Sequence, residues 1–226
     1  MDASYWQDTC SKALAVTRRW AAEQERSIAV LAALSEFHGR LRLLGQGGAV
    51  VGGALREQSD TLPLLHAKHV RGVENLMTAL RDALVRYEAL HAELARVHAS
   101  VWERFAQPAT QKAAQKAAGT DVGAMAQPSM SVVGAGRGIE SQRISLPSSL
   151  QFIEWIQELD EMFAHELLLK LQLVDAISHD MHPAQLADVH RIWSLQPNLS
   201  VPALEQLKLL VDSLTVPESS EPRPDD

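Results

Sequence analysis

The sequence predicts an all-α protein: an elongated bundle of three long amphipathic helices with coiled-coil character, followed by two short C-terminal helices. Three observations favour this fold class. Apolar residues recur at steps of three and four over long stretches, which is the spacing of one helix face. Glycine and proline gather between these stretches. Runs that alternate valine, isoleucine or threonine with polar residues, the pattern typical of strands, do not occur.

The first helix is expected from about Trp6 to Leu44. It should end at the glycine-rich run that begins at Gly45, because glycine makes helix propagation costly in backbone entropy. Its apolar stripe consists of Trp20, Ile28, Leu31, Leu34, Phe37, Leu41 and Leu44.

The second helix is expected to begin near Thr61, because Pro63 is tolerated in a first turn, and to reach about Phe105. Its apolar seam alternates steps of four and three, which is the repeat of a left-handed coiled coil. A helix of this length needs a partner along its side. The seam consists of Leu80, Leu84, Tyr87, His91, Leu94, His98, Val101 and Phe105.

Periodicity is lost after this helix and resumes at Pro147 and Ser148, a helix-start signal that opens the third long helix. Short helices should follow the breaks at Pro183 and Pro197. We therefore expect an N-terminal helical hairpin at 1–106, a disordered linker insert at 107–147, a helical segment at 148–215 that completes the bundle, and a disordered acidic tail at 216–226. The apolar stripe of the third helix consists of Phe152, Ile156, Leu159, Phe163, Leu167, Leu171, Val174 and Ile177.

Composition restricts the function. The chain has 226 residues, with 21 Lys and Arg against 28 Asp and Glu, so its net charge of −7 disfavours direct nucleic-acid binding. The single cysteine, Cys10, and the absence of a signal-peptide pattern predict a reducing intracellular compartment. No apolar run approaches the length of about 18 residues that a membrane-spanning helix needs, so no membrane contact is expected.

No catalytic constellation emerges from the sequence, so we expect a non-enzymatic protein with no cofactor or metal. His165 and Glu166 begin the zinc-protease pattern, but position 169 is leucine where the second histidine is required. His179 and His182, with Asp180 between them and His190 nearby, form a conceivable transition-metal cluster; a polar interhelical turn is the alternative.

Two tryptophans are candidates for binding another protein. Trp155 is offset from the apolar stripe of the third helix, so its indole either packs against a neighbouring helix or anchors a partner. Trp193, in the first short helix, is open to the same two interpretations.

The segment EWIQELD at 154–160, preceded by Pro147 and followed by a leucine-rich helix, resembles the AIRIM-type ribosome maturation factors, also described as a casein kinase 2 substrate family. The similarity extends to the helices through 77–87 and 12–34. The chain departs from the family at MFAHELLLK, 162–170, where basic and tyrosine residues are usual. Together with Trp193, this segment is also similar to a sibling subunit, the cyclin-dependent kinase 2 interacting protein.

The resemblance implies a non-catalytic adaptor that joins an AAA+ ATPase hexamer and a second small helical subunit. The assembly would act in large ribosomal subunit maturation, contact pre-60S particles indirectly and take part in replication-linked protein turnover. It implies a location in the nucleus, nucleolus and cytoplasm. The alternative is a coiled-coil scaffold that self-associates through His91 and His98. The candidate partner-binding residues are Glu154, Trp155, Gln157, Asp160 and Trp193.

Overall fold

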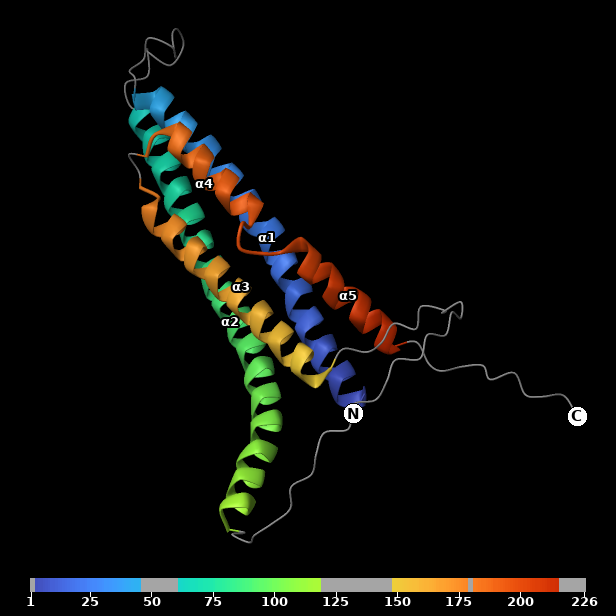
Figure 1. Cartoon of the computed structure of the whole chain (residues 1–226). Coiled ribbons are helices and arrows are strands. Elements are labelled where there is room, and N and C mark those ends of the chain that lie inside the picture. Colours follow the sequence, from blue (N-terminus) through green and yellow to red (C-terminus); the bar gives the residue numbers. More distant parts are fainter. Residues whose placement is uncertain (1–2, 46–60, 119–147, 179–180, 216–226) are drawn as a thin grey trace, which may run out of the picture.

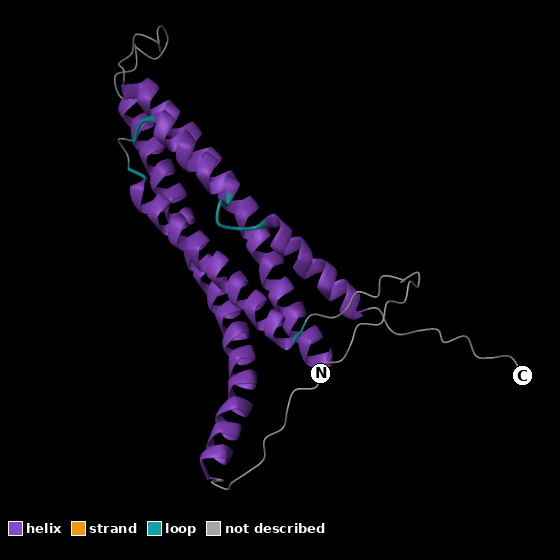
Figure 2. Cartoon of the chain, viewed as in Figure 1, coloured by secondary structure: helices purple, strands orange, loops and turns teal. Residues whose placement is uncertain are grey.

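A computed structural model describes residues 3–45, 61–118, 148–178 and 181–215. Within these ranges the chain forms five helices and no strand, which confirms the all-α fold class (Figures 1 and 2). The helices are α1 (Ala3–Gly45), α2 (Thr61–Ala118), α3 (Ser149–Ala176), α4 (Pro183–Leu195) and α5 (Val201–Thr215).

The two longest helices, α1 and α2, run in opposite directions and pack against each other (Figure 1). The predicted seam of α2 faces this interior, where Leu80, Tyr87 and Leu94 are fully buried. Near one end of the pair, the ring of Phe37 on α1 lies directly against the backbone of Gly72 on α2. A Cβ at position 72 would overlap that ring, so the glycine is what permits the close approach.

The remaining helices cover the hairpin on two sides. In Figure 1, α3 follows α2, while α4 and α5 follow α1. Aromatic rings fill the space between α1 and α3 at one end of the bundle. The indole of Trp6 stacks on Phe152 with centroids 4.3 Å apart, and its other stacked neighbour is Phe105 at 5.3 Å. These contacts tie the first turns of α1 and α3 to α2.

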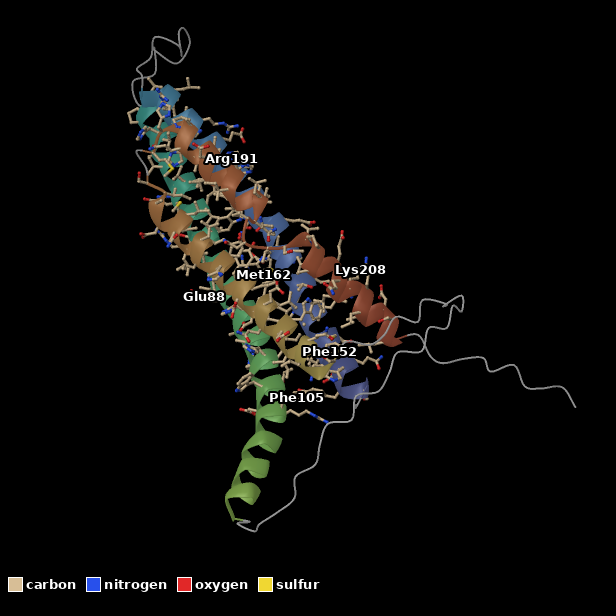
Figure 3. The ribbon with its side chains drawn as sticks, viewed as in Figure 1. Glu88, Phe105, Phe152, Met162, Arg191 and Lys208 are labelled. Atoms are coloured by element: carbon tan, nitrogen blue, oxygen red, sulfur yellow. The ribbon has the colours of Figure 1, made fainter. Side chains whose placement is uncertain are left out.

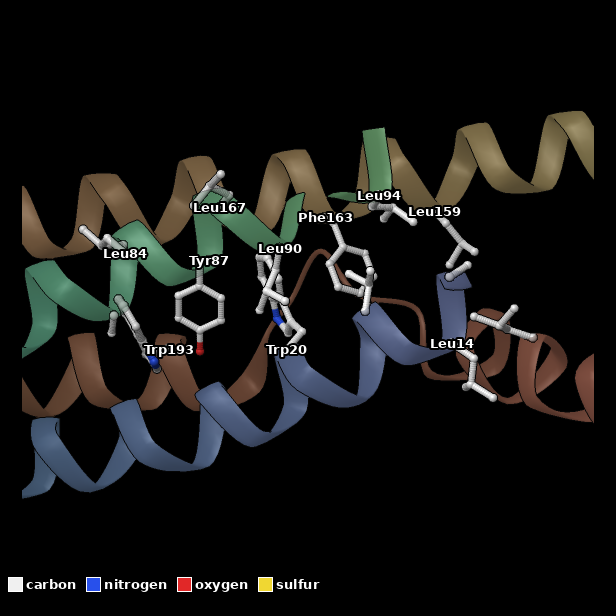
Figure 4. Close-up of a cluster of buried hydrophobic side chains, with 14 of the residues drawn as sticks. Leu14, Trp20, Leu84, Tyr87, Leu90, Leu94, Leu159, Phe163, Leu167 and Trp193 are labelled. Atoms are coloured by element: carbon white, nitrogen blue, oxygen red, sulfur yellow. The ribbon is translucent and has the colours of Figure 1, made fainter. Parts of the chain in front are cut away.

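The centre of the bundle is built around Trp20. Its indole lies 4.4 Å from the ring of Tyr87 and 4.7 Å from that of Phe163, so one side chain of α1 contacts both α2 and α3 (Figure 4). Trp193 of α4 completes the group at 6.2 Å from Tyr87. Rings with perpendicular or offset contacts of this kind add to the stability gained from burial alone.

Local side chains define where the shorter helices begin and end. Ser148 caps α3, as its sequence signal predicted, and exchanges hydrogen bonds with Gln151 in a capping box. His182 caps α4 in the same way with Gln185. Helix α4 ends at Leu195. Its C-cap, Gln196, is the only non-glycine residue with positive φ in the described part of the chain, at 45°. This left-handed conformation turns the chain toward α5.

Helix α2 runs further than the sequence predicted. It passes through Gln107, where the linker insert was expected to begin, and ends at Ala118, so the predicted boundary at 107 is not where the helix stops. The reason is that segment 111–118 is composed of alanine, glutamine and lysine, which are strong helix formers even without an apolar stripe. The rest of the predicted insert, 119–147, and the predicted tail, 216–226, lie outside the described residues.

Candidate partner-binding surface

The partner-binding residues predicted on α3 point in different directions. Glu154 and Gln157 are exposed, whereas Trp155 is partly buried. Successive residues of a helix are offset by about 100°, so Trp155 and Gln157 lie about 160° apart around the axis of α3. The structure therefore does not gather the predicted residues on one face.

Trp155 packs at the edge of the core, on the side of α3 that faces the α4–α5 turn. Met162 and Glu166 lie on the same stripe of α3 and contact that turn. The backbone N–H of Ser200 donates to Met162 Sδ at 3.4 Å, and the backbone N–H of Asn198 donates to Glu166 Oε2 at 3.3 Å. Figure 3 labels Met162 on α3. The indole N–H of Trp155 is buried and has no hydrogen-bond partner among the described residues. The role of Trp155 as a partner anchor stays a prediction.

Asp160 holds α3 against α2 and is not presented to solvent. Its Oδ2 accepts a hydrogen bond from His98 Nδ1 at 2.9 Å, and its Oδ1 lies 3.2 Å from His91 Nε2. The three side chains are only 18 to 26% exposed. The histidine seam is thus occupied by α3 of the same chain, and self-association through His91 and His98 would have to displace that helix.

Trp193 lies in the core. It is fully buried, and its indole N–H donates to Ser27 Oγ at 2.9 Å. Its backbone carbonyl accepts a hydrogen bond from the side-chain amide of Gln24. Of the two roles that the sequence left open for Trp193, core packing is the one that the structure shows, and the side chain offers no surface to a partner.

A buried lysine stands at the centre of the same region. Lys170 is fully buried, its Nζ donates to Gln24 Oε1 at 2.8 Å, and it lies 3.1 Å from Glu166 Oε1. The hydroxyl of Tyr87 donates to the same Gln24 oxygen at 2.9 Å, and the indole of Trp193 lies 4.3 Å from the ammonium group. Burial lowers the pKa of Lys170 to about 8, although Glu166 opposes that shift. The ammonium group therefore links all four helices α1 to α4.

Sequence reasoning missed Lys170. The stripe predicted for α3 contained Leu171, which is only partly buried, while Lys170 is fully buried. A signal was present, because Phe163, Leu167, Lys170 and Val174 are spaced by four, three and four residues, which is one helix face. A charged residue at such a position indicates a buried partner, here Glu166.

Sequence reasoning also missed Trp102. Its side chain is 57% exposed, and it lies four residues after His98 on the stripe of α2 that borders α3. On the antiparallel helix α3, the exposed apolar side chain of the first turn is Leu150, which is 63% exposed. We call these two residues the Trp102 surface. The sequence held a signal, since the seam residues Val101 and Phe105 leave Trp102 outside the core positions.

The sequence matches one protein family over residues 3–218, a range that includes all five helices. This family is described as "Ribosome biogenesis protein C1orf109-like". The chain belongs to this family. The match confirms the resemblance stated above for the segment around Trp155, and it includes the Trp102 surface as well. None of the curated proteins matches the sequence.

In this family member, the described residues provide no group of three or more histidine, cysteine or acidic side chains placed to hold a metal ion. His182 serves as the cap of α4, and His179 and Asp180 of the predicted cluster lie outside the described residues. Burial raises the pKa of Cys10 to about 12, which disfavours a reactive thiolate. No helix in the described ranges is both long and apolar enough to cross a lipid bilayer.

Proposed function

We propose that this ribosome biogenesis family member is a non-enzymatic adaptor subunit of an AAA+ ATPase complex in large ribosomal subunit maturation. In this role it would join the ATPase hexamer to a second small helical subunit resembling the cyclin-dependent kinase 2 interacting protein. The motor would then release a maturation factor from pre-60S particles, which the adaptor contacts indirectly. The family match supports the process, and the resemblance of the Trp155 segment suggests the partners.

The observation that carries the adaptor role is the exposure of Trp102 and Leu150. Tryptophan is enriched at the energetic centres of protein interfaces, and here the indole of Trp102 is 57% exposed. Leu150, on the neighbouring helix α3, is a second large apolar side chain that is exposed. The position is also well supported, since the Asp160 contacts to His91 and His98 fix α3 against α2 next to it. The two residues of the Trp102 surface are therefore exposed apolar side chains on helices that are fixed against each other, and they are available to a helical partner.

The most strongly perturbed titratable groups support a structural role and not a catalytic one. Lys170 is fully enclosed by Gln24, Glu166 and aromatic rings, so no substrate can reach its amine. The Cys10 thiol is buried and its pKa is raised. Tyr87, whose pKa is raised by burial, hydrogen bonds within the same core. These groups stabilise the bundle on which the adaptor surface is displayed.

The proposal is tested by native affinity purification of the tagged full chain, with mass spectrometry and sucrose gradients run with and without ATP. The expected result is co-purification of an AAA+ ATPase and a small helical protein, with pre-60S particles whose association depends on ATP. Recovery of the chain with only cytoskeletal or vesicle proteins would overturn the adaptor role, and recovery of copies of the chain alone would favour the self-associating scaffold.

Trp102→Ala tests the surface itself. We expect this variant to lose most of the co-purified small subunit, while its far-UV circular dichroism and thermal midpoint stay as in the wild type, because the indole makes few contacts in the free chain. Val85→Ala is the matched control, since Val85 is 62% exposed on another face of α2. Equal recovery of partners with Trp102→Ala and Val85→Ala would exclude the Trp102 surface as the contact.

A further inference from the structure

A groove lies at the end of the bundle where α1 ends and α2 and α4 begin. Figure 1 shows how the three helices meet at this end. Its volume is about 570 Å³, within the range of ligand-binding pockets. Four nitrogen-bearing side chains line it: His38 and Arg42 from α1, His66 from α2, and His182 at the start of α4. None of the described lining residues carries a carboxylate, although the whole chain has a net charge of −7. Among the described lining residues, Arg42 thus carries a permanent positive charge that no lining carboxylate offsets, in a protein that is acidic as a whole.

The hydrogen bonds of His182 leave two donors facing each other in this groove. Nδ1 of His182 accepts the backbone N–H of Ala184 at 3.2 Å, so Nδ1 holds no proton. The proton of the neutral ring is then on Nε2. That nitrogen lies 3.2 Å from Nη1 of Arg42, which is also only a donor. Two converging donors with no acceptor among the described residues are satisfied when an oxyanion binds between them, as in the recognition of a carboxylate by arginine.

The rest of the lining restricts the kind of anion. Leu41, Val70 and Met181 give the groove apolar walls beside the donor pair, and the volume greatly exceeds that of a single phosphate ion. A ligand that carries an apolar side chain next to a carboxylate would contact both the apolar walls and the donor pair. Nucleic acid is disfavoured, because the acidic chain repels a polyanion at long range. A metal ion is disfavoured as well, because the guanidinium of Arg42 already faces His182.

We infer that this groove binds an acidic peptide segment of a partner protein, with a carboxylate between Arg42 and His182 and a neighbouring apolar side chain against Leu41 and Val70. The groove lies at the opposite end of the bundle from the Trp102 surface. The inference therefore does not depend on the adaptor role, and the two sites are tested by different variants.

The experiment is a nuclear magnetic resonance titration of the ¹⁵N-labelled full chain. The probe is a blocked peptide of alternating leucine and glutamate, and the control peptide carries glutamine in place of glutamate. The expected result is a set of saturable shifts at residues 38–45, 65–70 and 181–186 with the glutamate peptide only. Equal binding of the glutamine peptide would overturn the inference, since no anion would then be recognised.

Two variants locate the carboxylate. Arg42→Gln is expected to weaken binding of the glutamate peptide about tenfold, the effect of one charge-assisted hydrogen bond. His182→Asn keeps a good helix cap while removing the Nε2 donor, and a similar loss is expected. The control is Arg40→Gln on the same helix, where Arg40 pairs with Glu36 and does not line the groove. Equal losses with Arg42→Gln and Arg40→Gln would show a general charge effect and reject the site.

Two competitors separate the peptide from other anions. Inorganic phosphate and a single-stranded RNA oligonucleotide are added to the same labelled chain. The peptide assignment is supported when phosphate shifts the groove resonances only weakly and RNA leaves them unchanged. If phosphate or RNA saturates these resonances at lower concentrations than the peptide, the groove is a phosphate or RNA site and the peptide assignment fails.

Discussion

Two tryptophans at the centre of the bundle, Trp20 and Trp193, differ from Trp155 and Trp102, which lie nearer the end where α3 begins. Trp20 and Trp193 are buried with their indole N–H groups bonded, to Gln196 Oε1 at 3.1 Å and to Ser27 Oγ at 2.9 Å. Trp155 has a buried indole N–H without a described partner, and Trp102 is more than half exposed. The two bonded indoles thus have structural roles, whereas the indole N–H of Trp155 lacks a described partner and Trp102 belongs to the candidate surface.

This difference separates the region that stabilises the bundle from the region that is available to another protein. The centre is held by buried polar groups with several partners each, so a change there should cost stability. The end of the bundle is held by ring stacking and by the Asp160 contacts, which leave apolar side chains free to contact another protein. Stability and partner binding should therefore respond to different substitutions.

The largest effect is expected from Lys170→Ala. Removing one member of a buried ion pair leaves Glu166 without its counter-charge, so the free energy of unfolding should fall by about 3–5 kcal/mol in chemical denaturation. Lys208→Ala, a change at an exposed lysine of α5, is the control and should stay within about 0.5 kcal/mol of the wild type. A loss below about 1 kcal/mol for Lys170→Ala would mean that the ammonium group is not essential to the centre.

The pH dependence of stability should report the same lysine. Burial lowers the pKa of Lys170 to about 8, whereas an unfolded lysine keeps its proton up to about pH 10.4. Between these values the unfolded chain binds more protons, so the contribution of Lys170 makes the free energy of unfolding rise with pH.

The measurement needs a background without Cys10. The pKa of its thiol is raised to about 12, so the contribution of Cys10 makes the free energy of unfolding fall with pH over the same range. Denaturation of Cys10→Ala from pH 7.5 to 10 should therefore be compared with Cys10→Ala/Lys170→Met. The free energy of unfolding should rise less with pH in the double variant than in Cys10→Ala. Identical pH slopes in the two variants would contradict the lowered pKa of Lys170.

A smaller contrast is expected between Trp193→Phe and Trp155→Phe. The first change removes a buried hydrogen bond to Ser27 and leaves a gap, so we expect a loss of about 2–3 kcal/mol in the free energy of unfolding. The second removes an N–H that has no described partner, so the loss should be under about 1 kcal/mol. Equal losses would mean that the indole N–H groups do not distinguish the two regions.

The smallest effect is expected from Asp160→Asn. One carboxylate contacts both His98 and His91, whereas an amide offers only one oxygen, so stability should fall by about 1 kcal/mol. Glu158→Gln changes an exposed side chain of the same helix and should have no measurable effect. An unchanged midpoint for Asp160→Asn would show that α3 is held by apolar packing alone.

Much of the fold was predictable because it depends on local patterns. The apolar stripes located α1, α3 and the two short helices, and Ser148 marked the start of α3. The end of α2 was not predicted, since residues 107–118 form helix through intrinsic propensity without an apolar stripe. Apolar periodicity in a sequence indicates a helix that packs against other helices. It gives no sign of a helical segment that extends beyond the helices on which it packs.

The candidate surface was predictable only in part. The family resemblance drew attention to Trp155. The exposure of Trp102 depends on how α3 packs against α2, and this packing cannot be predicted from the sequence of either helix alone. Lys170 was hidden for a related reason. Its burial is tolerable only because Gln24 and Glu166 meet it there, and Gln24 is 146 residues away along the chain.

The αL turn at Gln196 has a consequence for how the chain is made. Its side chain accepts a hydrogen bond from Trp20, which lies 176 residues earlier. During synthesis, α1 and α2 emerge long before α4 can cover Trp20 and Tyr87. A nascent chain would then expose these aromatic rings, and would be prone to aggregation, until α4 has been synthesised. Chaperones that bind exposed apolar surface on growing chains would meet these rings during that interval.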